Sequence, residues 1–172
     1  MSAYAYHLEK VEWAVWGIAT WDGTSKSGTS EASEQLRRAD FFRIIGKTCT
    51  RLRLRHRHLA IYAKTEWGRG RRGHCHFLIA KHGTQSTTPA ILAATIQELW
   101  SAEHGLAKVE PFDVTRQCDA VAYQCKQEFD AGGIPILHPE YVNGALQSLL
   151  RKNAECALSE TVPSPDTGLQ PF

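Results

Sequence analysis

The chain has 172 residues, of which 42% are hydrophobic and 22% are charged, and its formal net charge is +2. This length suits one domain with a single core, and the composition is too apolar for a disordered protein. No run approaches the roughly 18 apolar residues of a membrane span, and the first residues lack the pattern of a signal peptide. We therefore expect a protein without membrane contact, cytoplasmic in its host cell, or nuclear if the host is eukaryotic.

Positive charge is concentrated in one part of the chain. Nine Lys or Arg residues and one acid, Glu66, lie between Arg51 and His82, whereas the segment after Lys152 has three acids and no Lys or Arg. Many basic runs are only solvated faces, but a basic block in a nearly neutral protein is also typical of a surface that binds a polyanion.

The first half of the chain predicts a strand, a helix and a β-hairpin. Trp13–Trp21 is rich in aromatic and β-branched residues and is expected to be a strand. Glu31–Lys47 has a helical apolar stripe. Leu59–Glu66 and His74–Ala80 read as two strands joined by a turn rich in Gly and Arg, so the pair predicts a hairpin.

The second half predicts a helix over Pro89–His104, a strand over Ala107–Val114, a helix over Gln117–Phe129 and a last short helix over Tyr141–Lys152. Residues 1–152 are expected to form one domain, and the proline-containing residues 153–172 a disordered tail. The order of elements indicates an α+β fold, an antiparallel sheet with two helices on one face.

Three side chains with metal-ligand chemistry share one face of the hairpin. Residues two apart on a strand point the same way, so His74 and His76 lie together, and Glu66 has the matching parity on the neighbouring strand. This face, which also carries Lys64 and Tyr62, is expected to be open, and the opposite face to lie in the core. A His-x-His pair alone is more often an ordinary surface feature, but two imidazoles and a carboxylate suit Mn²⁺ or Mg²⁺, with Zn²⁺ as an alternative.

A tyrosine and a lysine share one face of the predicted helix over Gln117–Phe129. Tyr123 and Lys126 are three residues apart, which is helical spacing. A tyrosine attacks phosphate only when a metal or a base activates it, and a nearby cation stabilises the negative charge that develops. Considered alone, such a pair is more often a tyrosine ring packed on the sheet and a solvated lysine.

In combination, the two motifs resemble those of the HUH endonucleases, specifically the Rep proteins that initiate rolling-circle replication of viruses, phages and plasmids. The matching stretches are EWGRGRRGHCHFLIA (Glu66–Ala80) and VAYQCKQ (Val121–Gln127). The first strand, WGIATW (Trp16–Trp21), lies where the family's first motif lies but matches it loosely. The resemblance extends from about residue 12 to residue 130.

The resemblance implies a ferredoxin-like or RRM-like sheet with the active site, including the tyrosine helix, on the face opposite the two other helices. Glu66, His74 and His76 would bind Mn²⁺ or Mg²⁺, and Tyr123 would attack the scissile phosphate of single-stranded DNA with the assistance of Lys126. The products would be a 5′-phosphotyrosine link and a free 3′-OH. Independently of the resemblance, the charge and aromatic character of the basic block predict contacts with DNA, and the candidates are Arg53, Arg55, Lys64, Trp67, Arg69, Arg71 and Arg72.

Two departures from the family pattern are present. Cys75 is the middle residue of the His motif, and no second tyrosine follows Tyr123 by one helical turn, so a single-tyrosine enzyme is expected. The alternatives are an HUH transposase with the same residues and a non-catalytic RRM-like domain that binds nucleic acid. The chain contains no GxxxxGK[ST] pattern, so it is either part of a longer initiator or depends on a host helicase.

Overall fold

The computed structural model describes residues 8–22, 34–67, 73–81, 87–116, 128–129, 135–136 and 140–160, with the backbone alone for residues 67, 116, 128–129, 135–136 and 154–160. Within these ranges, none of the helices is both long and apolar enough to cross a membrane. In chain order the longer elements are β1 (Val15–Thr20), α2 (Glu34–Arg51), β2 (Leu59–Trp67), β3 (Gly73–Lys81), α3 (Pro89–Glu103), β4 (Ala107–Pro111), β7 (Glu140–Val142) and α5 (Gly144–Glu160). The short ones are η1 (His56–His58), η2 (Val114–Arg116), β5 (Glu128–Phe129) and β6 (Pro135–Ile136).

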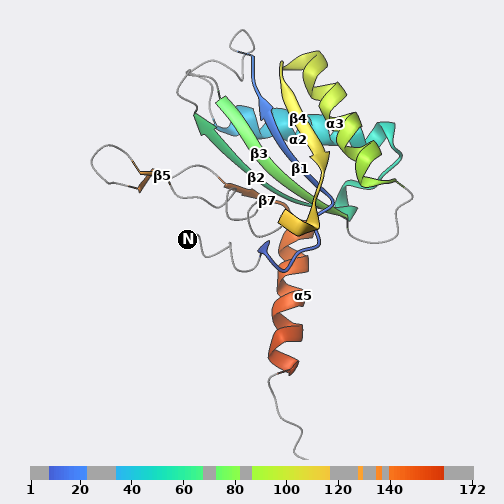
Figure 1. Ribbon diagram of the computed structural model, residues 1–172, viewed down its shortest axis with the longest axis vertical. Helices are drawn as coiled ribbons and strands as arrows, with labels where there is room; N and C mark the ends of the chain where they lie inside the picture. Colours follow the sequence, from blue (N-terminus) through green and yellow to red (C-terminus); the bar gives the residue numbers. More distant parts are fainter. Residues whose placement is uncertain are drawn as a thin grey trace, which may run out of the picture.

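The main sheet has five strands in the order β4-β1-β3-β2-β7, and all neighbouring pairs are antiparallel. The predicted hairpin is confirmed, with Glu66 opposite His74 and Lys64 opposite His76. The βαββαβ order of the first six elements and the strand order β4-β1-β3-β2 are compatible with a ferredoxin-like fold. The predicted α+β class is thus confirmed, and β7 adds a fifth strand beside β2 (Figure 1).

Two helices cover one face of the sheet. In Figure 1, α2 passes behind the strands, and the buried apolar residues of α2 and α3 form one cluster with the alternating residues of β1, β2 and β3. Phe77, from this cluster, lies against β1 at Gly17, where a Cβ atom would come within 2.3 Å of the ring. Only glycine allows the ring to approach β1 so closely at this point.

The two helices are also joined on their exposed side. Thr88 caps the start of α3 by accepting a hydrogen bond from the backbone N–H of Ile91, and Pro89 occupies the first turn. Glu103 at the end of α3 binds Arg43 and Lys47 of α2, with 2.6 Å between Lys47 Nζ and Glu103 Oε1. These contacts join α2 to α3 on the side away from the sheet, and the other face of the sheet has different neighbours.

The other face is only partly open, which corrects the sequence-based expectation. Tyr62 is fully buried there, and its hydroxyl donates to Glu140 Oε1 at 2.9 Å. A second hydrophobic cluster covers this end of the face and includes Leu8, Val11, Trp13, Ala60, Tyr62, Leu78, Ala80 and Leu146. The apolar side chains that β2 and β3 present here are buried by the start of α5 and the segment before β1, because burying that area stabilises the fold.

The chain after β4 departs from the prediction. Glu128–Phe129 pairs with Pro135–Ile136 as a small second sheet, so the helix predicted over Gln117–Phe129 does not reach Phe129. Residues 117–127, with Tyr123 and Lys126, lie outside the described residues. The predicted helix over Tyr141–Lys152 is also wrong at its start, because Tyr141 belongs to β7 and pairs with Ala63.

Asn143 explains why the chain changes from strand to helix at this point. Its side chain accepts from the N–H of Ile61 and of Leu146 at 3.0 Å each and donates to the carbonyl of Leu59. It thus continues the pairing with β2 and caps α5 in one step.

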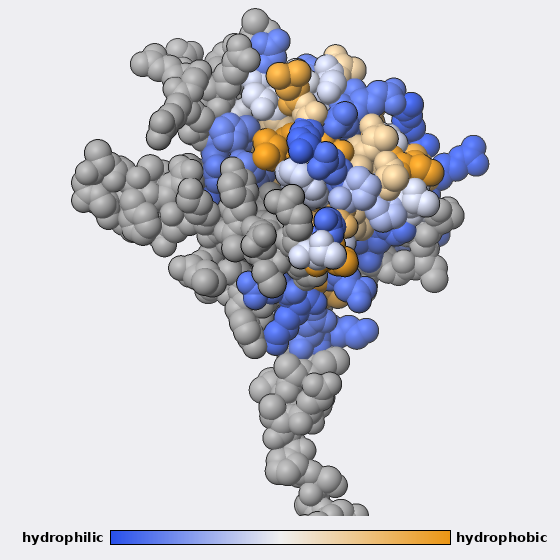
Figure 2. All heavy atoms as spheres, viewed as in Figure 1, coloured by the Kyte–Doolittle hydropathy of each residue, from blue (hydrophilic) through white to orange (hydrophobic). Residues whose placement is uncertain are grey.

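α5 continues to Glu160, past residue 152, where the sequence predicted the start of a disordered tail. Its first turns are anchored by Leu146 on the sheet, and the remainder is rich in Ala, Leu and Glu, which are strong helix formers. In Figure 1 this part of the helix extends away from the sheet. The surface around the start of α5 is mostly hydrophilic, whereas hydrophobic and hydrophilic side chains alternate over the sheet (Figure 2).

Candidate metal centre

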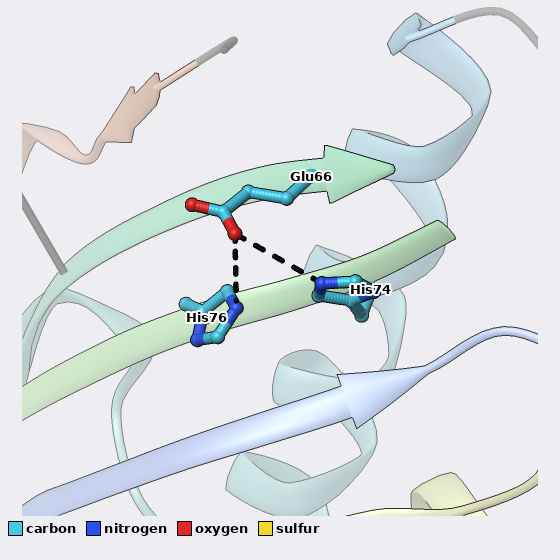
Figure 3. Close-up of side chains that lie close together, drawn as sticks. All are labelled: Glu66, His74 and His76. Carbon is cyan, nitrogen blue, oxygen red and sulfur yellow. Dashed lines mark ion pairs between the residues drawn. The ribbon is translucent and has the colours of Figure 1, made fainter. Parts of the chain in front are cut away.

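Glu66, His74 and His76 lie together at the end of the β2–β3 hairpin, as their strand parity predicted (Figure 3). Each offers one ligand atom, and the three atoms lie within 4.8 Å of one another. Glu66 Oε2 is 3.3 Å from His76 Nε2 and 3.9 Å from His74 Nε2. The group could therefore hold a metal ion.

The three ligand atoms would have to move closer together to bind one divalent cation. Ligands next to each other around an ion with bonds of about 2.1 Å are separated by about 3 Å. A cation would draw the three atoms together by side-chain rotation, since their strands are paired over this stretch. Two nitrogens and one oxygen on one side of an ion leave the opposite side for water or substrate oxygens.

The site is half enclosed. The side chain of His74 is 23% exposed, that of Glu66 is 13% exposed, and that of His76 is 4% exposed. The imidazole rings meet edge to face, with centroids 5.3 Å apart. His74 therefore lies at the entrance, and His76 forms the floor.

The electrostatics favour an ionised carboxylate. Burial alone would raise the pKa of Glu66, but hydrogen bonds from His76 and Lys64, with their charges, outweigh burial and lower this pKa to about 2. Lys64 Nζ lies 2.8 Å from Glu66 Oε1. An ionised carboxylate beside two imidazoles is ready to receive a cation without losing a proton from Glu66.

The cysteine between the two histidines points the other way. Cys75 is fully buried in the core under α2, and burial raises the pKa of its thiol well above the usual value. A thiol with a raised pKa is a poor metal ligand. The ligand set is therefore one carboxylate and two imidazoles.

The structure does not bring all the predicted DNA-binding residues to this site. The side chain of Lys64 is 5% exposed and bound to Glu66, so it faces the metal group rather than solvent. Arg53 and Arg55 are exposed but precede β2, whose first residue, Leu59, is seven residues from Glu66. At about 3.3 Å per residue this is roughly 23 Å.

Other predicted residues are only partly described or lie outside the described ranges. Trp67 ends β2 directly after Glu66 and pairs with Gly73 through its backbone. Arg69, Arg71 and Arg72 belong to residues 68–72, and Tyr123 and Lys126 to residues 117–127, which are outside the described part.

Two contacts near the site were missed in the sequence. The Lys64–Glu66 pair could have been found, since both residues have the same strand parity. The bond between Tyr62 and Glu140 joins residues 78 positions apart, across a strand too short to show a periodic pattern. Comparison with protein-family models, with curated proteins and with solved structures finds no match for this chain.

Proposed function

We propose that this chain is a metal-dependent nuclease of the HUH type that nicks single-stranded DNA and becomes covalently attached to it. The observation that carries the proposal is the convergence of Glu66, His74 and His76 at the open end of the sheet. A ferredoxin-like sheet with this ligand set agrees with the resemblance of the two sequence motifs to Rep proteins. The role would be the initiation of rolling-circle replication in the host cytoplasm, or in the nucleus of a eukaryotic host.

The proposed chemistry is a transesterification. A divalent cation, Mn²⁺ or Mg²⁺, would act as a Lewis acid toward an oxygen of the scissile phosphate. The hydroxyl oxygen of Tyr123 would form a bond to phosphorus, and the bond to the 3′ oxygen of the preceding nucleotide would break. The tyrosine proton is lost and the 3′ oxygen gains one, which leaves a 5′-phosphotyrosine and a free 3′-OH. Lys126 would stabilise the tyrosyl oxygen.

The positively charged residues between the two hairpin strands support single-stranded DNA as the substrate. Arg69, Arg71 and Arg72 lie between Glu66 and His74 in the sequence. The strand residues that flank these arginines, Trp67 and Gly73, form the cross-strand pair next to that of Glu66 and His74. Their positive charges would attract the phosphates of a single strand toward the cation, with Trp67 available for stacking on a base. A host helicase would open the duplex if the chain works as a whole protein.

The test is a search for a covalent complex. The full chain is incubated with Mn²⁺ and a library of single-stranded oligonucleotides, and a band that resists denaturant is sought on a gel. We expect the band with Mn²⁺ and its loss in EDTA. Tyr123→Phe should abolish it and keep DNA binding, because only one oxygen is removed.

The matched control is Tyr141→Phe. The Tyr141 side chain is buried and its hydroxyl donates to the carbonyl of Glu34 at 3.4 Å, so this variant should still form the adduct. An adduct in Tyr123→Phe would reject Tyr123 as the nucleophile. DNA binding that needs no metal and gives no adduct would instead favour the non-catalytic RRM-like domain. A transposase of the same type would give the same band but with transposon-end sequences as preferred substrates.

A further inference from the structure

A lysine is buried beside the metal group. The side chain of Lys64 is 5% exposed and that of Glu66 13% exposed, with 2.8 Å between Nζ and Oε1. Lysine is almost never buried unless it is paired, since the free energy of removing its charge from water can match or exceed the Coulombic gain of the pair. The fold buries this ammonium against the carboxylate that meets the two imidazoles, so its position affects what can bind there.

The two oxygens of Glu66 have different partners. Oε2 lies 3.3 Å from His76 Nε2 and 3.9 Å from His74 Nε2, whereas Oε1 is bound by the ammonium of Lys64. Figure 3 shows Oε2 directed at both rings and the other oxygen turned away from them. Lys64 is the cross-strand partner of His76, so β2 and β3 fix the ammonium and the imidazole on adjacent strands.

We infer that Lys64 is a positioning residue that restricts Glu66 to coordination through Oε2 alone and so makes the site select small, six-coordinate cations over Ca²⁺. The inference rests on the metal site of the proposed function. Ca²⁺ takes six to eight oxygens at about 2.3–2.6 Å and commonly uses both oxygens of one carboxylate, whereas Mg²⁺ holds six ligands at about 2.0–2.1 Å. A carboxylate with one oxygen held by an ammonium can give one oxygen to a six-coordinate cation such as Mg²⁺. It cannot give both oxygens, as Ca²⁺ commonly requires.

The charge of Lys64 has a separate effect from its hydrogen bond. A positive charge near the site repels all divalent cations, so its removal should strengthen the binding of each of them. The hydrogen bond, in contrast, sets how many carboxylate oxygens Glu66 can offer to the cation. It should therefore change the ratio of the Kd values for Ca²⁺ and Mn²⁺. Variants can therefore separate the two effects.

The experiment is calorimetric titration of the full chain, stripped of metal, with MnCl₂ or CaCl₂ and no DNA. We expect wild type to prefer Mn²⁺, partly through its imidazole ligands. Lys64→Met removes charge and hydrogen bond, and the Kd ratio of Ca²⁺ to Mn²⁺ should fall about tenfold. Lys64→Gln keeps a donor without the charge; both ions should bind more tightly and the ratio should stay within about threefold of wild type.

Lys108→Met is the matched control. Lys108 pairs with Glu110 on β4 at the same spacing, with 3.4 Å between Nζ and Oε1. The Lys108→Met substitution therefore removes the same charge from the same sheet. Its ratio should equal that of wild type. If Lys64→Met fails to fold, Lys64→Ser serves instead, since a small side chain leaves room for water beside Glu66.

An unchanged ratio in Lys64→Met or Lys64→Ser, or an equal fall in Lys108→Met, would overturn the inference. Binding of neither ion by wild type would overturn this inference and the proposed metal site together. Selective binding of Mn²⁺ that depends on Lys64, without any DNA adduct, would support the inference and contradict only the nuclease.

Discussion

Two Lys-x-Glu segments lie wholly on the described strands of the main sheet, and their surroundings differ. Lys64 and Glu66 lie on β2, while Lys108 and Glu110 lie on β4, and both pairs form a salt bridge between residues two apart. The side chains of the first pair are 5% and 13% exposed, and those of the second are 64% and 47% exposed. β2 lies inside the sheet between β3 and β7, whereas β4 is an edge strand.

The neighbours of each pair follow from this difference. On β2, the carboxylate meets two imidazoles from β3, so the pair becomes part of a candidate metal centre. On β4, the ammonium of Lys108 lies 5.3 Å from the ring centroid of Trp16 on β1 and remains in water. The surroundings of the same motif therefore depend on its strand, because an interior strand supplies partners on both sides and removes the solvent that weakens charge interactions.

The largest effect should come from replacing the two glutamates in turn. Glu66→Gln removes an anionic ligand, so Mn²⁺ affinity should fall about 100-fold or more, and DNA cleavage should be lost with it. Glu110→Gln should leave both within about twofold, since its carboxylate contacts solvent and Lys108. Calorimetry with MnCl₂ and the denaturing gel measure the two quantities, and circular dichroism controls for folding. Equal losses in both variants would remove the distinction between the strands.

The pH dependence of stability, measured without metal, should distinguish the carboxylate of Glu66 from that of Glu110. The pKa of Glu66 is about 2 in the folded chain against 4.5 for the ordinary group, so between these values the folded state binds fewer protons than the unfolded state. The resulting stabilisation, up to about 3 kcal/mol, is complete above pH 4.5 and is lost as the pH falls through 2. Urea unfolding in EDTA from pH 7 to pH 2 measures it.

Two variants serve as controls in that titration. Glu66→Gln should lose the part of the acid dependence that belongs to this group, whereas Glu110→Gln should keep the profile of wild type. A Glu66→Gln profile parallel to that of wild type over the whole range would contradict the electrostatic description of the site.

The hairpin and its ligands could be predicted because their information is local. Alternation along β2 and β3 assigns Glu66, His74 and His76 to one face, and the short turn brings the two strands together. The core on the helix side follows from the same alternation. For this reason the candidate metal group could be derived from the two strands of the hairpin alone, whereas the fold class required the order of the elements along the chain.

The cover of the opposite face could not be predicted, because its information is distant in sequence. Tyr62 belongs to one buried cluster with Leu8, Val11 and Leu146, which are distant from it in sequence. The three residues of β7 show no periodicity, so the sequence predicts that Tyr141 and Val142 begin a helix. Without β7, Lys64 read as an exposed phosphate ligand; with it, β2 becomes an interior strand and the ammonium turns to Glu66.

The smallest expected effect concerns the exposed pair on β4. A double-mutant cycle with Lys108→Met and Glu110→Gln should give a coupling of about 0.5 kcal/mol or less, because water screens the charges and both side chains lose rotamer freedom on pairing. In 1 M NaCl the Debye length is about 3 Å, shorter than the 3.4 Å between Lys108 Nζ and Glu110 Oε1, so the coupling should vanish. Urea unfolding in EDTA, without added NaCl and in 1 M NaCl, gives the free energies of unfolding of wild type, the two single variants and the double variant. In the parallel double-mutant cycle, Lys64→Met and Glu66→Gln should keep most of their coupling free energy in 1 M NaCl, since ions do not enter the space between two buried groups. A coupling above about 1 kcal/mol on β4, or the disappearance in salt of the coupling on β2, would show that strand position does not separate the two pairs.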